Sequence, residues 1–190
     1  KIKSLSRFDM KVLCLLLVIA SFSYGQTINM FYWIDDWGLV FNMLHPNIFP
    51  GNFGHPAYRY ATTPFHLLFP LVGLNAQVYF LLGFLQYYLT AALLYFFTKY
   101  LTKNSLVSLV SAAIFASGYF GSYALYRLSN SYQLTQTAII FLITPWLLVA
   151  HFKTRMAKYY VLSAISFICA LEFFFLRSQG LLPIILAIVF

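Results

Sequence analysis

Residues 12–44 read VLCLLLVIASFSYGQTINMFYWIDDWGLVFNML, and this stretch decides the fold. Its first part, residues 12–28, is an apolar run close to the roughly 20 residues that an α-helix needs to cross a bilayer. Its second part places two neighbouring carboxylates, Asp35 and Asp36, between two tryptophans, whose rings favour the headgroup layer of a membrane. The stretch therefore predicts a membrane-spanning helix that leads into a segment at the membrane surface.

The residues that follow the aspartates have the spacing of a short surface helix. Trp37, Val40, Phe41 and Leu44 recur at the interval of one helical face, so we expect the aspartate pair at the N-terminus of a helix lying on the membrane. Carboxylates are favoured there because a helix N-terminus has free N–H groups and the positive end of the dipole. A capping role explains one aspartate better than two, which leaves a functional role open for the pair.

The composition of the whole chain favours a membrane protein. Of 190 residues, 62% are hydrophobic and 8% are charged, and apolar runs of about spanning length recur along the sequence. We expect an all-α, polytopic integral membrane protein that forms a single transmembrane domain over residues 1–190. The two cysteines, Cys14 and Cys169, lie far apart in apolar segments, so we expect no disulfide and no metal site built on them.

Five full transmembrane helices and a truncated sixth are predicted, with the N-terminus inside. The five cover residues 12–28, 77–98, 105–126, 134–150 and 159–176, and the sixth run is residues 181–190. Because this last run is about half the length of a span, we expect further helices beyond Phe190. Residues 29–75 form an external loop with interfacial helices, the second at residues 65–74, and polar turns are expected at residues 127–133 and 177–180. In the third span, a row of small residues four apart, Ser108, Ala112 and Ala116, allows a partner helix to approach closely.

The distribution of basic residues supports this topology. The formal charge of +8 comes from Lys and Arg residues that fall mostly in short loops, which membrane topology explains better than nucleic-acid binding does. Nine of the 12 Lys and Arg residues lie in segments assigned to the inside: Lys1, Lys3, Arg7, Lys11, Lys99, Lys103, Lys153, Arg155 and Lys158. Cytoplasmic loops carry such an excess of positive charge, so the aspartate loop is predicted to be extracytoplasmic.

Several stretches resemble one family of membrane enzymes. These are the Asp35 and Asp36 motif, YRY at residues 58–60, LLFPLVGLN at residues 67–75 and AALLY at residues 91–95. Together they are similar to the GT-C class of membrane glycosyltransferases, in particular to the protein O-mannosyltransferase-like and dolichyl-phosphate-mannose-dependent families. Those families frequently have a Lys-Glu pair at the turn where this chain has Arg177 and Ser178, so no acidic residue is carried over there.

The resemblance implies transfer of a sugar, with inversion, from a polyprenyl-phosphate carrier to an acceptor hydroxyl outside the cell membrane. It implies Asp35 as general base and Asp36 as its supporter, or the reverse order. Arg59, Arg127 and Arg177 are candidates to bind the carrier phosphate, and His55 is a further candidate for substrate binding. The expected partners are the lipid-linked sugar, membrane lipid and an acceptor of open identity, with no nucleic acid and no cofactor. The implied location is the plasma membrane.

Other interpretations of these residues remain open. Each arginine could be only an anchor at the membrane interface. His45, His55 and His66 could supply metal ligands, although their spacing matches no metal motif. Glu172, within the fifth span, could pair with Arg177. A transporter or flippase of lipid-linked sugars usually shows repeats and broken helices, whereas only Pro145 interrupts the fourth span here. A non-catalytic membrane scaffold is the third alternative.

Overall fold

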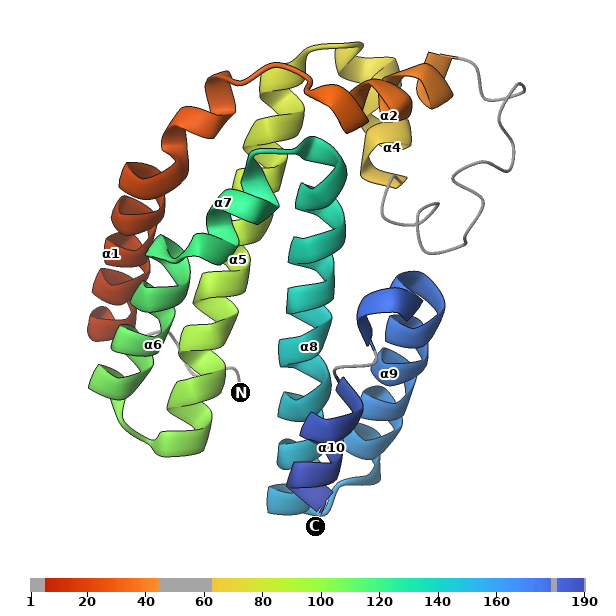
Figure 1. Ribbon diagram of the computed structural model, residues 1–190. Helices are drawn as coiled ribbons and strands as arrows, with labels where there is room; N and C mark the ends of the chain where they lie inside the picture. The colour runs from red at the N-terminus through yellow and green to blue at the C-terminus, as the bar shows by residue number, and fades with distance from the viewer. Residues whose placement is uncertain (1–5, 45–62, 179–180, 190) are drawn as a thin grey trace.

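The computed structural model describes residues 6–44, 63–178 and 181–189, and every regular element in these residues is a helix. In chain order the elements are α1 (Arg7–Tyr24), the 3-10 helix η1 (Gly25–Asn29), α2 (Ile34–Leu44), α4 (Thr63–Val72), α5 (Ala76–Thr102), α6 (Ser105–Ser117), α7 (Tyr119–Leu125), α8 (Leu128–Thr154), α9 (Ala157–Ser178) and α10 (Leu181–Val189). The long helices stand side by side, and α2 and α4 lie at one end of them (Figure 1). The all-α prediction is confirmed for this part of the chain.

Three helical segments are long and apolar enough to cross a bilayer: Arg7–Asn29, Ala76–Thr102 and Leu134–Thr154. A fourth crossing is present if α6 and α7 count as one bent span. The apolar part of α9 within the described residues, Ala157–Leu171, is shorter than a full span. The structure thus supports a membrane protein with three or four candidate spans, whereas five full spans with a truncated sixth, and an internal N-terminus, remain predictions.

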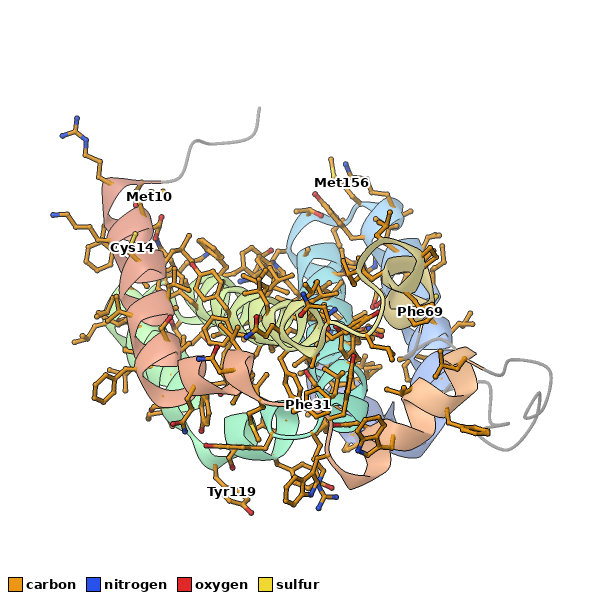
Figure 2. All side chains as sticks on the ribbon, turned by 90° about the horizontal axis from the view of Figure 1, so that it is seen from above. Met10, Cys14, Phe31, Phe69, Tyr119 and Met156 are labelled. Carbon is orange, nitrogen blue, oxygen red and sulfur yellow. The ribbon has the colours of Figure 1, made fainter. Side chains whose placement is uncertain are left out.

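The third predicted span is bent rather than straight. Between α6 and α7 the chain turns by 46° at Gly118, whose backbone is extended with φ −80° and ψ 164°. A Cβ on Gly118 would lie 2.6 Å from the carbonyl oxygen of Ile114, so any side chain there would force the backbone to shift. The hydroxyl of Tyr24, the last residue of α1, donates a hydrogen bond to the Gly118 carbonyl. Beyond the bend, Tyr119 is 85% exposed and points away from the bundle (Figure 2).

Helices α1, α5 and α6 pack closely because small residues line their contacts. The predicted small-residue row of α6 is buried, with Ala112 and Ala116 fully covered in a core that also contains Ala20 of α1 and Ala91 of α5. The predicted close approach of helices is therefore confirmed, and the partners of this row are helices of the same chain. Short side chains let the backbones come near enough for dispersion contacts, which drive helix association in lipid.

Helix α8 begins earlier than predicted and is unbroken. Residues 128–133, predicted as part of a polar turn, form its first turns because Leu128 and Tyr132, four residues apart on one face, are both buried. The helix also continues through Pro145, contrary to the predicted interruption. Next to this proline α8 is joined to α9, since the Ser163 hydroxyl donates to the Thr144 carbonyl at 3.0 Å.

The described helices alternate between two ends of the bundle (Figure 1). We call one the basic end: it contains the start of α1 and the turns from α5 to α6 and from α8 to α9. Its basic residues are Arg7, Lys11, Lys99, Lys103, Lys153, Arg155 and Lys158. We call the other the aspartate end: it contains η1, α2, α4 and the junction of α7 with α8. The described basic turns and the start of α2 therefore lie at opposite ends of the bundle.

Candidate functional site

The first turn of α2 holds one of the two aspartates by hydrogen bonds to the backbone. Asp36 is the third residue of the helix, and its Oδ2 accepts a hydrogen bond from the backbone N–H of Trp33 at 3.0 Å. The backbone N–H of Asp36 in turn donates to the Trp33 carbonyl at 2.6 Å. A carboxylate at this position satisfies a free N–H and lies at the positive end of the helix dipole. Asp36 therefore fixes the geometry of the turn that contains Asp35.

Asp36 is removed from solvent, with 1% of its surface exposed. Nearby, Tyr32 is 5% exposed, and its hydroxyl finds no hydrogen-bond partner among the described residues. Burial, then the Tyr79 phenol and the Asp36 carboxylate, raise the pKa of Tyr32 to about 12. The Tyr32 hydroxyl thus keeps its proton at neutral pH, and it can donate a hydrogen bond to a ligand oxygen.

Residues of α5 and α8 form the buried cluster against which the start of α2 packs. The Tyr132 hydroxyl of α8 donates to the Tyr79 carbonyl of α5 at 2.9 Å, and the Tyr79 hydroxyl donates to the Gly73 carbonyl at 2.8 Å. Tyr32 and Val40 pack into the same buried cluster as these tyrosines. The start of α2 is therefore attached to two long helices and is not a freely moving surface segment.

Aromatic side chains cover the outer side of the turn. The rings of Phe31, Tyr32 and Trp37 contact one another, with centroids 5.2 to 5.7 Å apart. Phe31, in the link between η1 and α2 (Figure 2), is 62% exposed. Trp33 and Trp37 are about half exposed. The predicted apolar face of this helix is divided: Val40 is buried against the bundle, while Trp37, Phe41 and Leu44 are exposed.

The other predicted site residues are placed as follows. Asp35 lies in the first turn of α2, directly before Asp36. Arg127 is exposed and precedes α8 at the aspartate end, and its neighbour Leu128 packs in the cluster of Tyr32. Arg177 lies in the last turn of α9. Arg59 and His55 lie outside the described residues, as does His45.

The predicted metal alternative is not tested, because two of its three histidines, His45 and His55, lie outside the described residues. Among the described residues, no three His, Cys, Asp or Glu side chains lie close enough together to hold a metal ion. The buried turn of Asp36 is instead lined by aromatic rings and backbone groups. In the part of the chain that the structure describes, this turn has one buried carboxylate, that of Asp36, and one buried phenol without a hydrogen-bond partner, that of Tyr32.

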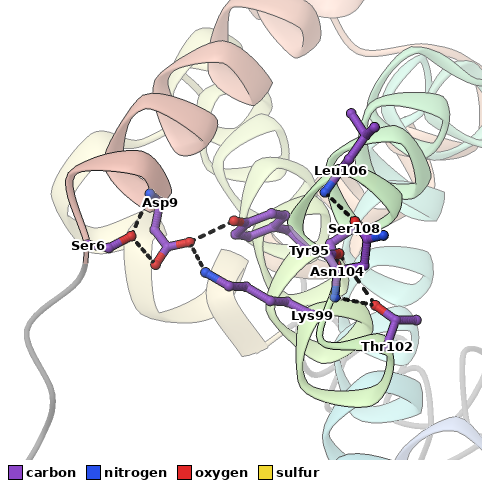
Figure 3. Close-up of polar contacts among 8 residues, drawn as sticks. All are labelled: Ser6, Asp9, Tyr95, Lys99, Thr102, Asn104, Leu106 and Ser108. Carbon is purple, nitrogen blue, oxygen red and sulfur yellow. Dashed lines mark hydrogen bonds and ion pairs between the residues drawn. The ribbon is translucent and has the colours of Figure 1, made fainter.

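A polar cluster at the basic end was not predicted from the sequence. The carboxylate of Asp9 accepts hydrogen bonds from Tyr95 at 2.6 Å and from Ser6 at 2.7 Å, and it forms an ion pair with Lys99 (Figure 3). Ser6 also caps α1, since its hydroxyl oxygen accepts from the Asp9 N–H at 3.1 Å. The sequence does contain a signal for the local half, because Ser followed three residues later by an acid is a helix-start pattern. The partners on α5 have no local signal.

We compared the chain with protein-family models, with curated proteins and with solved structures, and none of the three comparisons finds a match.

Proposed function

We propose that the protein is a membrane glycosyltransferase that moves a sugar from a polyprenyl-phosphate carrier to an acceptor hydroxyl at the aspartate end. Asp35 is the general base and Asp36 positions it. The observation that carries this proposal is the buried Asp36 carboxylate, which holds the first turn of α2 through the Trp33 N–H. Asp36 fixed in this way holds the backbone of the turn that contains Asp35, and a general base requires a fixed position.

In the proposed reaction the acceptor oxygen attacks the anomeric carbon while its proton passes to Asp35. The bond between that carbon and the carrier phosphate breaks, polyprenyl phosphate leaves, and the configuration of the sugar inverts. Asp36, which is buried, acts in this proposal by holding the backbone of the turn through the Trp33 N–H.

Tyr32 and Arg127 support a phosphosugar as the ligand. A buried hydroxyl without a partner costs about 1 to 3 kcal/mol, and a sugar or phosphate oxygen in contact with Tyr32 would remove that cost. The exposed guanidinium of Arg127 is suited to bidentate contact with phosphate. Both residues belong to segments that pack in the cluster beneath α2.

The location of the turn suits a lipid-borne donor. The exposed rings of Phe31, Trp33 and Trp37 are at the end of spanning helices, where aromatic side chains favour the headgroup layer. A carrier whose polyprenyl chain lies in the bilayer would present its phosphosugar at this depth. With the basic end in the cytoplasm, the reaction takes place on the extracytoplasmic face of the plasma membrane.

The test compares Asp35→Asn with Asp36→Asn in membrane vesicles, supplied with radiolabelled polyprenyl-phosphate hexoses. Asp35→Asn removes the proton acceptor and should lower transfer by about 10²- to 10⁴-fold. Asn at position 36 can still accept the Trp33 N–H through its amide oxygen, so Asp36→Asn should lower transfer less. Transfer at the wild-type rate by both variants would make the pair a structural feature and leave the transporter or scaffold interpretation in its place.

A further inference from the structure

Two lysines from different turns converge on one aromatic ring at the basic end. Lys103, in the turn from α5 to α6, has its Nζ 4.7 Å from the centroid of the Tyr100 ring. Lys153, in the last turn of α8, has its Nζ 4.2 Å from the same centroid and donates a hydrogen bond to the Tyr100 carbonyl at 3.2 Å. The fold thus gathers two ammonium groups, 50 positions apart in the sequence, around a single side chain.

At the basic end, the positive charge of the described residues exceeds their negative charge. Among the described side chains, Asp9 is the one carboxylate at the basic end, and Lys99 already pairs with it. The C-terminal ends of α5 and α8 contribute about half a negative charge each, but the adjoining N-termini of α6 and α9 contribute a similar positive charge. Lys103 and Lys153 therefore leave a surplus of positive charge at Tyr100, and Arg155 and Lys158 add to it in the turn from α8 to α9.

Two of the basic residues in these turns have a backbone conformation that is unfavourable for residues with a side chain. Lys103 and Arg155 close α5 and α8 with φ of 57° and 58°, in the left-handed region that glycine and asparagine adopt most readily. A lysine and an arginine at these two positions cost more conformational energy than glycine would. They add two positive charges at the same end of the bundle.

Apolar side chains lie in and beside the two turns that carry the cations. Tyr100 contacts the indole of Trp146 on α8, with ring centroids 6.1 Å apart. Leu101, Phe152 and Met156 are each between 39% and 50% exposed beside the two turns. Cations next to exposed apolar surface, at the end of spanning helices, match a ligand whose phosphate carries hydrocarbon chains.

We propose that Lys103 and Lys153 bind the phosphate of an anionic phospholipid in the membrane leaflet at the basic end, with its acyl chains along α5 and α8 near Trp146. This site is separate from the aspartate end and does not depend on the proposed glycosyltransferase activity. Basic groups at the membrane surface attract anionic lipid with a strength that corresponds to about fivefold in affinity per Lys or Arg.

Trp146 provides a local probe, because Trp33→Phe and Trp37→Phe leave it as the single tryptophan of the chain, which has three. The protein is reconstituted in phosphatidylcholine vesicles that contain a minor fraction of brominated lipid, whose bromine atoms quench nearby indoles. Brominated phosphatidylglycerol should quench Trp146 more strongly than the same fraction of brominated phosphatidylcholine. The double variant Lys103→Gln/Lys153→Gln should lower the preference for phosphatidylglycerol by about fivefold or more.

Lys11→Gln is the matched control, because Lys11 is an exposed lysine of the basic end on α1, away from Tyr100. It should keep the preference for phosphatidylglycerol. Equal quenching by the two lipids in the parent protein would overturn the proposal, as would a preference that survives the double variant. Loss of the preference on addition of millimolar inorganic phosphate, at constant ionic strength, would show a site for free phosphate and would also overturn it.

Discussion

The carboxylate of Asp9 on α1 forms an ion pair with Lys99 near the end of α5, and so joins two helices whose contacting residues are 90 positions apart. Tyr95, one turn before Lys99, donates to the same carboxylate oxygen. At the basic end, one carboxylate therefore binds two side chains of α5 and also Ser6, the residue that caps α1.

Asp9→Asn should destabilise the contact between α1 and α5. The variant keeps the shape of the side chain but removes the charge, and hydrogen bonds to charged groups are worth about 1.5 to 3 kcal/mol. Because the Lys99 side chain is 31% exposed, water screens part of this energy, so we expect a loss of about 1 kcal/mol. Thermal unfolding in detergent, compared among Asp9→Asn, Lys99→Gln and the double variant, measures the coupling. Strictly additive losses would mean that the pair contributes nothing.

The bend between α6 and α7 should depend on Gly121. A Cβ on Gly121 would lie 2.3 Å from Cε2 of Tyr24, so Gly121→Ala should push this ring away and destabilise the protein by about 1 to 3 kcal/mol. Gly25→Ala is the matched control, since a Cβ at that position meets its nearest atom at 3.9 Å. Unfolding temperatures in detergent should therefore fall for the first variant and stay nearly constant for the second. Equal effects of the two would contradict the packing described for Tyr24.

Tyr32→Phe should change sugar transfer without lowering the stability of the fold. Its hydroxyl is buried without a partner among the described residues, so its removal should leave stability unchanged or slightly higher. Tyr132→Phe removes a hydroxyl that donates to the Tyr79 carbonyl, and it should lower stability by about 0.5 to 1.5 kcal/mol. If Tyr32 binds a ligand oxygen as proposed, Tyr32→Phe should nevertheless reduce sugar transfer. Full transfer by this variant would remove Tyr32 from the site.

The orientation in the membrane can be tested with single cysteines, after Cys14 and Cys169 are replaced by alanine. Leu74, between α4 and α5, is 43% exposed at the aspartate end, and Met156, between α8 and α9, is 50% exposed at the basic end. An impermeant maleimide should label Leu74→Cys in intact cells and Met156→Cys only after the membrane is opened. The reverse pattern would put Asp35 and Asp36 in the cytoplasm and exclude an extracytoplasmic transferase.

The sequence predicted those features that depend on local composition. Hydropathy located the first two spans, because α1 and α5 are continuous apolar runs. It missed the bend at Gly118, because the bend involves Tyr24, which lies 94 residues away. Hydropathy also predicted a polar turn up to Gln133, whereas α8 begins at Leu128. The burial of Leu128 and Tyr132 against α5 cannot be recognised from one segment alone.

The position of the two aspartates in the chain could be predicted from the sequence, but their contacts could not. The sequence placed both aspartates at a helix start, and the structure places them in the first turn of α2. The burial of Asp36 and its hydrogen bond with the Trp33 backbone could not be predicted from the sequence. The ion pair of Asp9 was missed for the same reason as the bend, since a lone acid in a basic segment gives no hint of a partner on α5.

The distance in sequence between Asp9 and Lys99 also sets an order of events during biosynthesis. A ribosome that adds 5 to 20 residues per second makes Lys99 about 5 to 20 seconds after Asp9. During that interval Ser6 is the one partner of this carboxylate in the structure that has already been synthesised. The ion pair and the Tyr95 hydrogen bond that join α1 to α5 can therefore form only after α5 has been synthesised.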